Sequence, residues 1–192
     1  MATHRASVAR SVPTGNPMNL ALSVAVYASL VRAAGLRLDF PGSAAAFGAL
    51  TQVIYAEQLA GAAAWSALTP QAAGEVFNVA NGDPTRWSHL WPAFADYFGV
   101  PAAGPRPIPL SSFMPELAPL WRAMAAGYGL AQPELGSLAN WGFLEFLFAI
   151  EYDIVLALGK IRRAGFVRHP DTLEGFLKRF DEYRRARIIP TF

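Results

Sequence analysis

One stretch of this sequence predicts much of the local structure: Phe77-Asn78-Val79-Ala80-Asn81-Gly82-Asp83-Pro84-Thr85-Arg86-Trp87, followed by Leu90-Trp91-Pro92 and Tyr97-Phe98-Gly99-Val100. The apolar run from Val76 to Val79 predicts a short buried strand. Asn81 and Gly82 both tolerate a positive φ, so a sharp turn is expected directly after that strand.

A helix is expected to begin where the turn ends. Asp83 is a typical N-cap, and Pro84 suits the first helical position because its missing N–H costs nothing there. Large apolar side chains then recur at helical spacing, at Trp87, Leu90, Trp91, Phe94 and Phe98. Gly99 follows where a glycine commonly ends a helix. Strand, turn and aromatic helix are thus predicted from consecutive residues.

The same stretch carries a resemblance to a known family. Its pattern, FNV-x-NGD followed by W and by LWP-xx-A-x-YFGV, resembles the C-terminal half of the progesterone 5β-reductase and iridoid synthase-like reductases, which are atypical extended short-chain dehydrogenases/reductases. The other matching pieces, in chain order, are His4-Arg5, Met18-Asn19-Leu20, Tyr55-Ala56-Glu57-Gln58-Leu59-Ala60, Trp141-Gly142-Phe143, Lys160 to Phe166, Asp171-Thr172 and Ile188-Ile189-Pro190. Their order and spacing make the resemblance specific over nearly the whole chain.

The resemblance implies a fold and a division of the chain. We expect a mainly helical protein with a few short strands, corresponding to the C-terminal part of an extended short-chain dehydrogenase. Residues 1–192 would form a single substrate-binding domain. Within it, residues 1–50 would be a remnant of the last Rossmann strand, helix and strand, and residues 51–192 would be a helical cap.

The residues do not match the cofactor machinery of that family. Complete relatives carry a glycine-rich G-x-x-G-x-x-G turn after their first strand, whereas Gly42, Gly48, Gly61 and Gly74 are scattered here. No tyrosine is followed four residues later by a lysine, so the Tyr-x₃-Lys proton relay is also missing. The resemblance implies NADP or NAD as cofactor, but we expect this chain alone to bind neither and to transfer no hydride.

His4 and Arg5 are the candidate cofactor contacts. Relatives carry a His-Arg-Pro strand here, followed by an apolar-Gly turn that lines the nicotinamide end of the cofactor, and residues 2–9 could form such a strand. Ala6 stands where the proline is expected, which weakens the match. A purely structural role for His4 is the alternative.

Six residues are candidate substrate contacts by resemblance: Met18, Asn19, Trp141, Phe143, Leu147 and Ile150. Met18 and Asn19 would lie near the join between cofactor and substrate, or would simply pack a helix start. Phe143, Leu147 and Ile150 fall on one helical stripe, which relatives use as a wall over an apolar enone. An ordinary core face is the competing interpretation of that stripe.

Further helices are predicted by periodicity and by capping residues. They span about 17–34 (ended by Gly35), 55–68, 111–127 (capped by Ser111 or Ser112), 140–154 (capped by Asn140) and a last helix from Asp171, and residues 160–166 are expected to continue to a turn near Gly165. In the last helix Phe176 and Phe180 should face inward, and Arg184 and Arg185 outward. A strand is expected at 36–40, and the prolines between 101 and 109 predict a surface loop. Glu57 is expected to pin its helix rather than to react.

Composition limits the possible functions. Apolar residues make up 53% of the chain and charged residues only 16%. Such a composition suggests a pocket for an apolar ligand, an oligomer interface or a missing partner half, and the last two explain it best. There is no cysteine, and the three histidines are far apart, so neither a disulfide framework nor a zinc site is expected.

Charge and hydropathy bear on partners and location. The net charge of +2 is too small to predict nucleic-acid binding. The basic residues near the end of the chain alternate with acidic ones, which is typical of a solvated helix face. The apolar run from Leu20 to Val31 is shorter than the roughly 20 residues that a membrane helix needs. We therefore expect a cytoplasmic protein, whose partners are a small hydrophobic ligand and either further copies of itself or a missing Rossmann half.

Two functions remain open at this point. In the first, the chain is the substrate-binding portion of an NAD(P)H-dependent reductase that acts on apolar enones or carbonyl compounds, and it is not expected to transfer hydride by itself. Alternatively, it is a stand-alone binder of a small hydrophobic ligand, or a cofactor-independent enzyme, derived from such a reductase.

Overall fold

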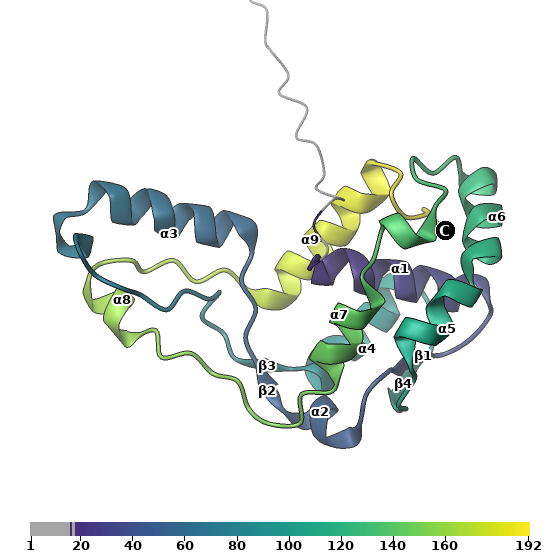
Figure 1. The fold of residues 1–192 in the computed structure, drawn as a ribbon, viewed down its shortest axis with the longest axis horizontal. Helices are drawn as coiled ribbons and strands as arrows, with labels where there is room; N and C mark the ends of the chain where they lie inside the picture. Colours follow the sequence, from purple (N-terminus) through teal and green to yellow (C-terminus); the bar gives the residue numbers. More distant parts are fainter. Residues whose placement is uncertain (1–15, 17) are drawn as a thin grey trace, which may run out of the picture.

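The computed structural model describes residue 16 and residues 18–192 (Figure 1). The strand expected at residues 2–9, with His4 and Arg5, lies outside the described residues. The helices, in chain order, are α1 (Leu20–Ala33), α2 (Ala44–Gly48), α3 (Ala56–Leu68), α4 (Trp87–Phe98), α5 (Leu110–Glu116), α6 (Ala118–Tyr128), α7 (Trp141–Phe148), α8 (Gly159–Arg163) and α9 (Thr172–Arg185). The strands are β1 (Leu38–Phe40), β2 (Leu50–Thr51), β3 (Thr85–Arg86) and β4 (Ala102–Pro105). The chain is mainly helical with a few short strands, as predicted.

The central element is α1, around which α4, α6, α7 and α9 pack (Figure 1). Its apolar residues surround the helix, and every residue from Leu22 to Val31 is buried. Asn19 begins the helix, because its side-chain oxygen accepts a hydrogen bond from the Leu22 N–H at 3.1 Å. Gly35, at φ +66°, follows its end, as expected.

Aromatic side chains from α4 and α9 fill the core between these helices. Trp91, Phe94 and Phe98 are fully buried on α4. The Phe94 ring lies 5.0 Å from that of Phe176 and 5.3 Å from that of Phe180, both on α9. Each ring buried in this way stabilises the fold by about 1.5–3 kcal/mol before packing terms are added. The predicted inward orientation of Phe176 and Phe180 is confirmed.

The strands form two separate pairs. β1 and β4 are parallel, and β2 and β3 are antiparallel. The carbonyl of Leu38 in β1 accepts a hydrogen bond from the Trp91 indole at 3.0 Å, which ties the first pair to α4. Parallel sheets normally have several strands with helices on both faces, so the β1–β4 pair is unusually small.

The strand predicted at Val76–Val79 is absent, and Val76 is 83% exposed. The turn at Gly82 is confirmed by its φ of +113°. The helix does not begin at Asp83 and Pro84, because Thr85 and Arg86 pair with β2 first and α4 starts at Trp87. The Asp83 carboxylate instead accepts hydrogen bonds from Thr172 at the start of α9.

Two other helix predictions differ from the structure in length. The helix predicted at 111–127 is two helices, α5 and α6, divided at Leu117, with Pro119 in the first turn of α6. Ser111 does not cap α5; its N–H and hydroxyl donate to the Glu145 carboxylate of α7, at 2.8 and 2.6 Å. The helix capped by Asn140 ends at Phe148, and the chain to Ala157 has no regular structure. The proline-rich loop contains the short strand β4.

A second, smaller core lies between α3 and α8, which extend together to one side of the molecule (Figure 1). Ala62 of α3 packs there with Leu158, Ile161 and Phe166, and the rings of Trp65 and Phe166 lie 5.5 Å apart. The helix predicted at 55–68 and the turn at Gly165, with φ +108°, are both confirmed. The division of the chain at residue 50 stays a prediction.

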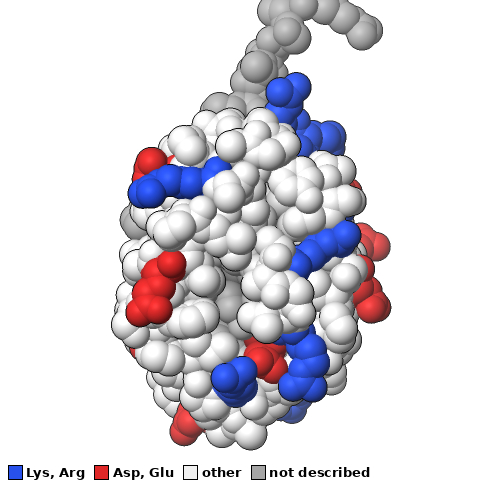
Figure 2. Space-filling view, turned by 90° about the vertical axis from the view of Figure 1, so that its right-hand side faces the viewer, with Lys and Arg blue, Asp and Glu red and all other residues white. Residues whose placement is uncertain are grey.

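Within residues 18–192, no helix combines the length and hydropathy needed to cross a bilayer. On the face that includes α5 and α6, charged side chains of both signs lie scattered among uncharged ones (Figure 2).

Candidate functional site

Asn81, in the turn before β3, connects its own segment to two distant ones, residues 53–55 and the start of α9. Its N–H donates to the Val53 carbonyl at 2.9 Å, and its side-chain oxygen accepts from the Tyr55 N–H at 3.1 Å. Its amide group donates to the Thr172 hydroxyl at 3.1 Å. Asn81 and Thr172 are each 1% exposed, so these hydrogen bonds replace water for groups that would otherwise be unsatisfied.

Asp83 attaches the same turn to the beginning of α9. Its carboxylate accepts hydrogen bonds from both the N–H and the hydroxyl of Thr172, each at 2.7 Å. A carboxylate at a helix N-terminus interacts favourably with the helix dipole and with the free N–H groups of the first turn. Asp83 therefore helps to cap α9 across the fold, although its position in the sequence suggested a cap for α4.

Tyr55, which precedes α3, completes this junction. Its hydroxyl donates to the Thr172 carbonyl. Its ring lies directly against Gly175 of α9, where a β-carbon would overlap the ring. Burial, and secondarily the Asp83 carboxylate, raises the pKa of Tyr55 above the usual value of a tyrosine.

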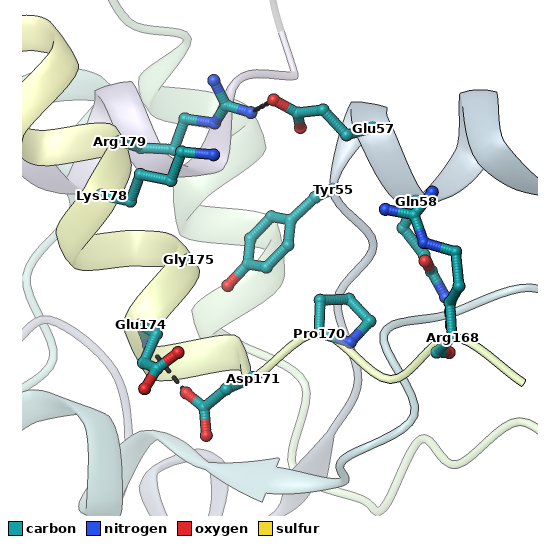
Figure 3. A pocket seen from close by; sticks show the side chains of 10 residues that line it. All are labelled: Tyr55, Glu57, Gln58, Arg168, Pro170, Asp171, Glu174, Gly175, Lys178 and Arg179. Atoms are coloured by element: carbon teal, nitrogen blue, oxygen red, sulfur yellow. Dashed lines mark hydrogen bonds and ion pairs between the residues drawn. The ribbon is translucent and has the colours of Figure 1, made fainter.

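A pocket of about 350 Å³ opens beside the junction, between the start of α3 and the first turns of α9 (Figure 3). Its lining residues are Tyr55, Glu57, Gln58, Arg168, Pro170, Asp171, Glu174, Gly175, Lys178 and Arg179. Three cationic and three acidic side chains are among them, so the lining is polar and close to neutral overall.

Two interactions connect the walls of this pocket. Glu57 of α3 forms an ion pair with Arg179 of α9, and this contact pins α3 as predicted (Figure 3). Gln58, 2% exposed, donates from its amide to the carbonyls of Ala80, at 3.3 Å, and Arg168, at 3.0 Å. Its side-chain oxygen has no hydrogen-bond partner among the described residues. One buried acceptor beside the pocket thus has no partner among the described residues.

Comparison with known proteins assigns the chain to a family. The profile of the PRISE-like Rossmann-fold domain matches residues 4–190. The chain belongs to this family. The resemblance seen in the sequence is thereby confirmed, and it covers the described fold from the start of α1 past the end of α9.

Individual relatives are similar over one half of their length. (S)-8-oxocitronellyl enol synthase ISY1 of Nepeta racemosa is 28% identical over 90% of this chain and 45% of its own length. The enol synthase CYC2 of Camptotheca acuminata is 28% identical over 97% of this chain and 49% of its own. Short chain dehydrogenase sirR of Leptosphaeria maculans is 32% identical over 93% of this chain and 48% of its own. The chain spans about half the length of the curated relatives it matches.

The first two predicted substrate residues of this PRISE-like chain lie at the start of α1. Met18 is 63% exposed, so it packs little against this chain. The Asn19 side-chain oxygen caps α1 and also accepts from the Tyr183 hydroxyl of α9, at 3.1 Å. Neither residue lines the pocket of Figure 3. Helix-start packing is therefore visible for Asn19, and a substrate contact stays a prediction for both.

The other predicted substrate residues lie on and just after α7. Trp141, 7% exposed, belongs to the core together with Leu144 and Phe148, which are the buried positions of this helix. The predicted stripe is a different one, and its members Phe143, Leu147 and Ile150 are each partly buried. The core therefore uses a face next to the predicted wall, and these residues do not line the pocket of Figure 3 either.

The described residues do not fit a dinucleotide. Gly42, after β1 and before α2, comes nearest to a strand–glycine–helix turn, but the Phe148 carbonyl and the Phe40 ring fill the space beside it. A pyrophosphate needs open backbone N–H groups at such a turn. His4 and Arg5 lie outside the described residues, so a cofactor contact from them stays a prediction.

The Tyr55 hydroxyl is engaged by a backbone carbonyl, and the residues from 18 onward contain no cluster of metal-binding side chains. Sequence reasoning identified Asn81 as a turn and Asp171-Thr172 as a cap, but it did not predict that they meet. Their presence in matching family pieces was the only signal, because contacts between residues 55, 81 and 172 have no local pattern.

Proposed function

We propose that this chain is the substrate-binding portion of an NAD(P)H-dependent reductase of the PRISE-like type, which reduces apolar enones or carbonyl compounds. A nucleotide-binding half completes it, and the chain alone transfers no hydride. One observation carries the proposal: the family match extends over residues 4–190, while the chain corresponds to only about half of each relative. Relatives named as enol synthases and as a short chain dehydrogenase support the class of reaction.

The described residues support this assignment in a second way. The helical part contains a closed aromatic core but no turn suited to a dinucleotide. We assign the apolar wall of the substrate site to Phe143, Leu147 and Ile150, because these side chains are only partly buried, and we add the buried Trp141 of the same helix. Met18 and Asn19 would lie where substrate and nicotinamide meet.

A stand-alone hydrophobic binder is the second candidate. It is favoured by the core itself, since Trp91, Phe94 and Phe98 are fully buried by residues of this chain alone. Such a core predicts a protein that folds without a partner. Exposed apolar residues such as Leu68, at 84%, and Val76, at 83%, favour the incomplete reductase instead.

A pair of titrations distinguishes the candidates. The purified chain is titrated with NADPH, in the absence and presence of progesterone as an apolar enone, and binding is followed by tryptophan fluorescence. The proposal predicts no saturable NADPH binding by the chain alone. Progesterone binding that is tight and independent of nucleotide would favour the stand-alone binder, and tight NADPH binding by the chain alone would contradict the missing-half assignment.

A further inference from the structure

The outer face of α3 is apolar although it faces solvent. Ala56, Leu59, Ala60, Ala63 and Ala67 lie on one side of the helix, opposite Gln58 and Ala62, which face the molecule. All five are exposed, and Leu59 is 53% exposed. We refer to these five residues as the α3 outer face.

This pattern is unusual for a surface helix. Solvent-facing stripes of globular proteins normally carry charged or polar side chains, and a helix that is apolar on all sides is normally buried on all sides. The only charged residue of α3 is Glu57, and it is engaged by Arg179. In Figure 1, α3 lies at the upper left edge of the molecule, with α8 below it. The composition of α3 is therefore that of a helix covered on both sides.

The parallel pair β1–β4 also has fewer strands than a complete domain of this type would have. β1 and β4 form a parallel pair of only two strands, whereas a Rossmann-type domain has an open parallel sheet with helices on both faces. About half the length of the relatives has no counterpart in this chain. A partner that supplies the missing strands brings an apolar sheet face, and alanine side chains allow such a face to approach a helix closely.

We propose that the α3 outer face is the docking surface for the nucleotide-binding half of the reductase, which covers it with an apolar face of its sheet. This inference rests on the proposed function, because it requires that half to exist. It adds the specific surface through which the two halves associate.

The absence of cysteine from the sequence allows a direct test. Ala63→Cys places a thiol on the α3 outer face, and Ala123→Cys places one at an exposed alanine of α6 as a matched control. Each variant is prepared in two forms. One is the full chain alone; the other, the joined protein, is the full chain fused after the part of the Leptosphaeria maculans sirR dehydrogenase that the match does not cover. The maleimide alkylation rate at each thiol is measured by mass spectrometry, and NADPH binding by the joined protein is measured in parallel.

The inference predicts that the joined protein binds NADPH and that alkylation of Ala63→Cys is at least about tenfold slower than in the chain alone, because thiol reactivity requires access. The rate for Ala123→Cys should not change.

If NADPH binds and neither rate changes, docking through α3 is wrong while the proposed function stands. If NADPH does not bind and neither rate changes, the proposed function itself fails. If Ala63→Cys reacts more slowly as the concentration of the chain alone rises, a second copy is the occupant and the inference is overturned.

Discussion

At the scale of single residues, the contact between Tyr55 and Gly175 shows how one side chain depends on the absence of another. The ring of Tyr55 lies where a β-carbon at position 175 would be, and its hydroxyl reaches the first residue of α9. The position is helical and does not have a positive φ, so it is the lack of a side chain, rather than backbone freedom, that makes glycine necessary.

Gly175→Ala should therefore destabilise the protein. Alanine in a helix interior usually stabilises by about 0.5–1 kcal/mol relative to glycine, but overpacking against Tyr55 should reverse this and cost about 1–3 kcal/mol. Urea unfolding measures the difference. Gly127→Ala in α6 is the matched control, because nothing lies within 4 Å of its added methyl group; that variant should be neutral or more stable. Equal stability of the two variants would contradict the role of the Tyr55 contact.

The proposed wall on α7 also allows a test at this scale. Phe143 is partly buried and Phe146 is 64% exposed on the same helix. Phe143→Ala in the joined protein of the previous section should weaken progesterone binding by about tenfold, because an aromatic contact area is lost. Phe146→Ala should leave the binding constant unchanged. An equal loss in both variants would indicate a general effect on α7, and no loss in either would remove Phe143 from the site.

At the scale of elements, the C-terminal end of α4 is stabilised by side chains from two other helices. Arg32 of α1 donates to the Phe98 carbonyl, and Arg184 of α9 donates to the Tyr97 carbonyl at 3.3 Å. The Arg184 guanidinium also lies 4.1 Å from the centre of the Tyr97 ring. Cations near the last carbonyls of a helix offset its negative end. The sequence predicted that Arg184 points outward, but it is partly buried against α4.

Arg184→Met should show this effect. The substitution keeps an apolar stem but removes the charge, the hydrogen bond and the cation–π contact, and we expect a loss of about 1–2 kcal/mol of unfolding free energy. Arg185→Met is the control, since Arg185 is exposed and should change stability by less than about 0.5 kcal/mol. Thermal unfolding of both variants decides the question; a loss of the same size for Arg185 would show that the charge acts non-specifically.

At the scale of the whole molecule, buried tyrosines link stability to alkaline pH. Burial is the main cause that raises the pKa of Tyr27, Tyr55 and Tyr183 in the folded protein, with the Asp39 carboxylate as a second cause for Tyr27. The unfolded chain loses these protons near pH 10, whereas the folded protein retains them to higher pH. The stabilisation is therefore fully present below pH about 10 and is lost as pH rises above it.

Urea unfolding at a series of pH values from 8 to 11.5 should accordingly show a constant stability up to pH about 10 and a steady fall above it. Tyr27→Phe removes one of these groups, together with its 3.0 Å hydrogen bond to the Asp39 carbonyl. This variant should be less stable at pH 8 but should lose less further stability above pH 10. An unchanged slope in Tyr27→Phe would show that its ionisation is not coupled to folding.

Local patterns determined much of this protein. Period-3.6 apolar spacing placed α1, α3, α4 and α9, and the cap at Asp171 and the glycines 35, 82, 99 and 165 lie where short-range geometry requires them. Order and spacing of short motifs also identified the family. These features depend on residues that are close in the sequence, within about one or two helical turns, so they can be predicted from the sequence directly.

Only the tertiary structure decided which elements meet. Residues 76–79 were predicted to form a strand but do not, and it is Thr85 and Arg86 that pair with β2. Asp83 caps α9 rather than α4, because the Thr172 N–H and hydroxyl lie within its reach and make two hydrogen bonds. The pocket beside Tyr55 likewise combines residues from separate parts of the chain. Contacts over such separations depend on how the helices pack around α1, and no local pattern of residues encodes that arrangement.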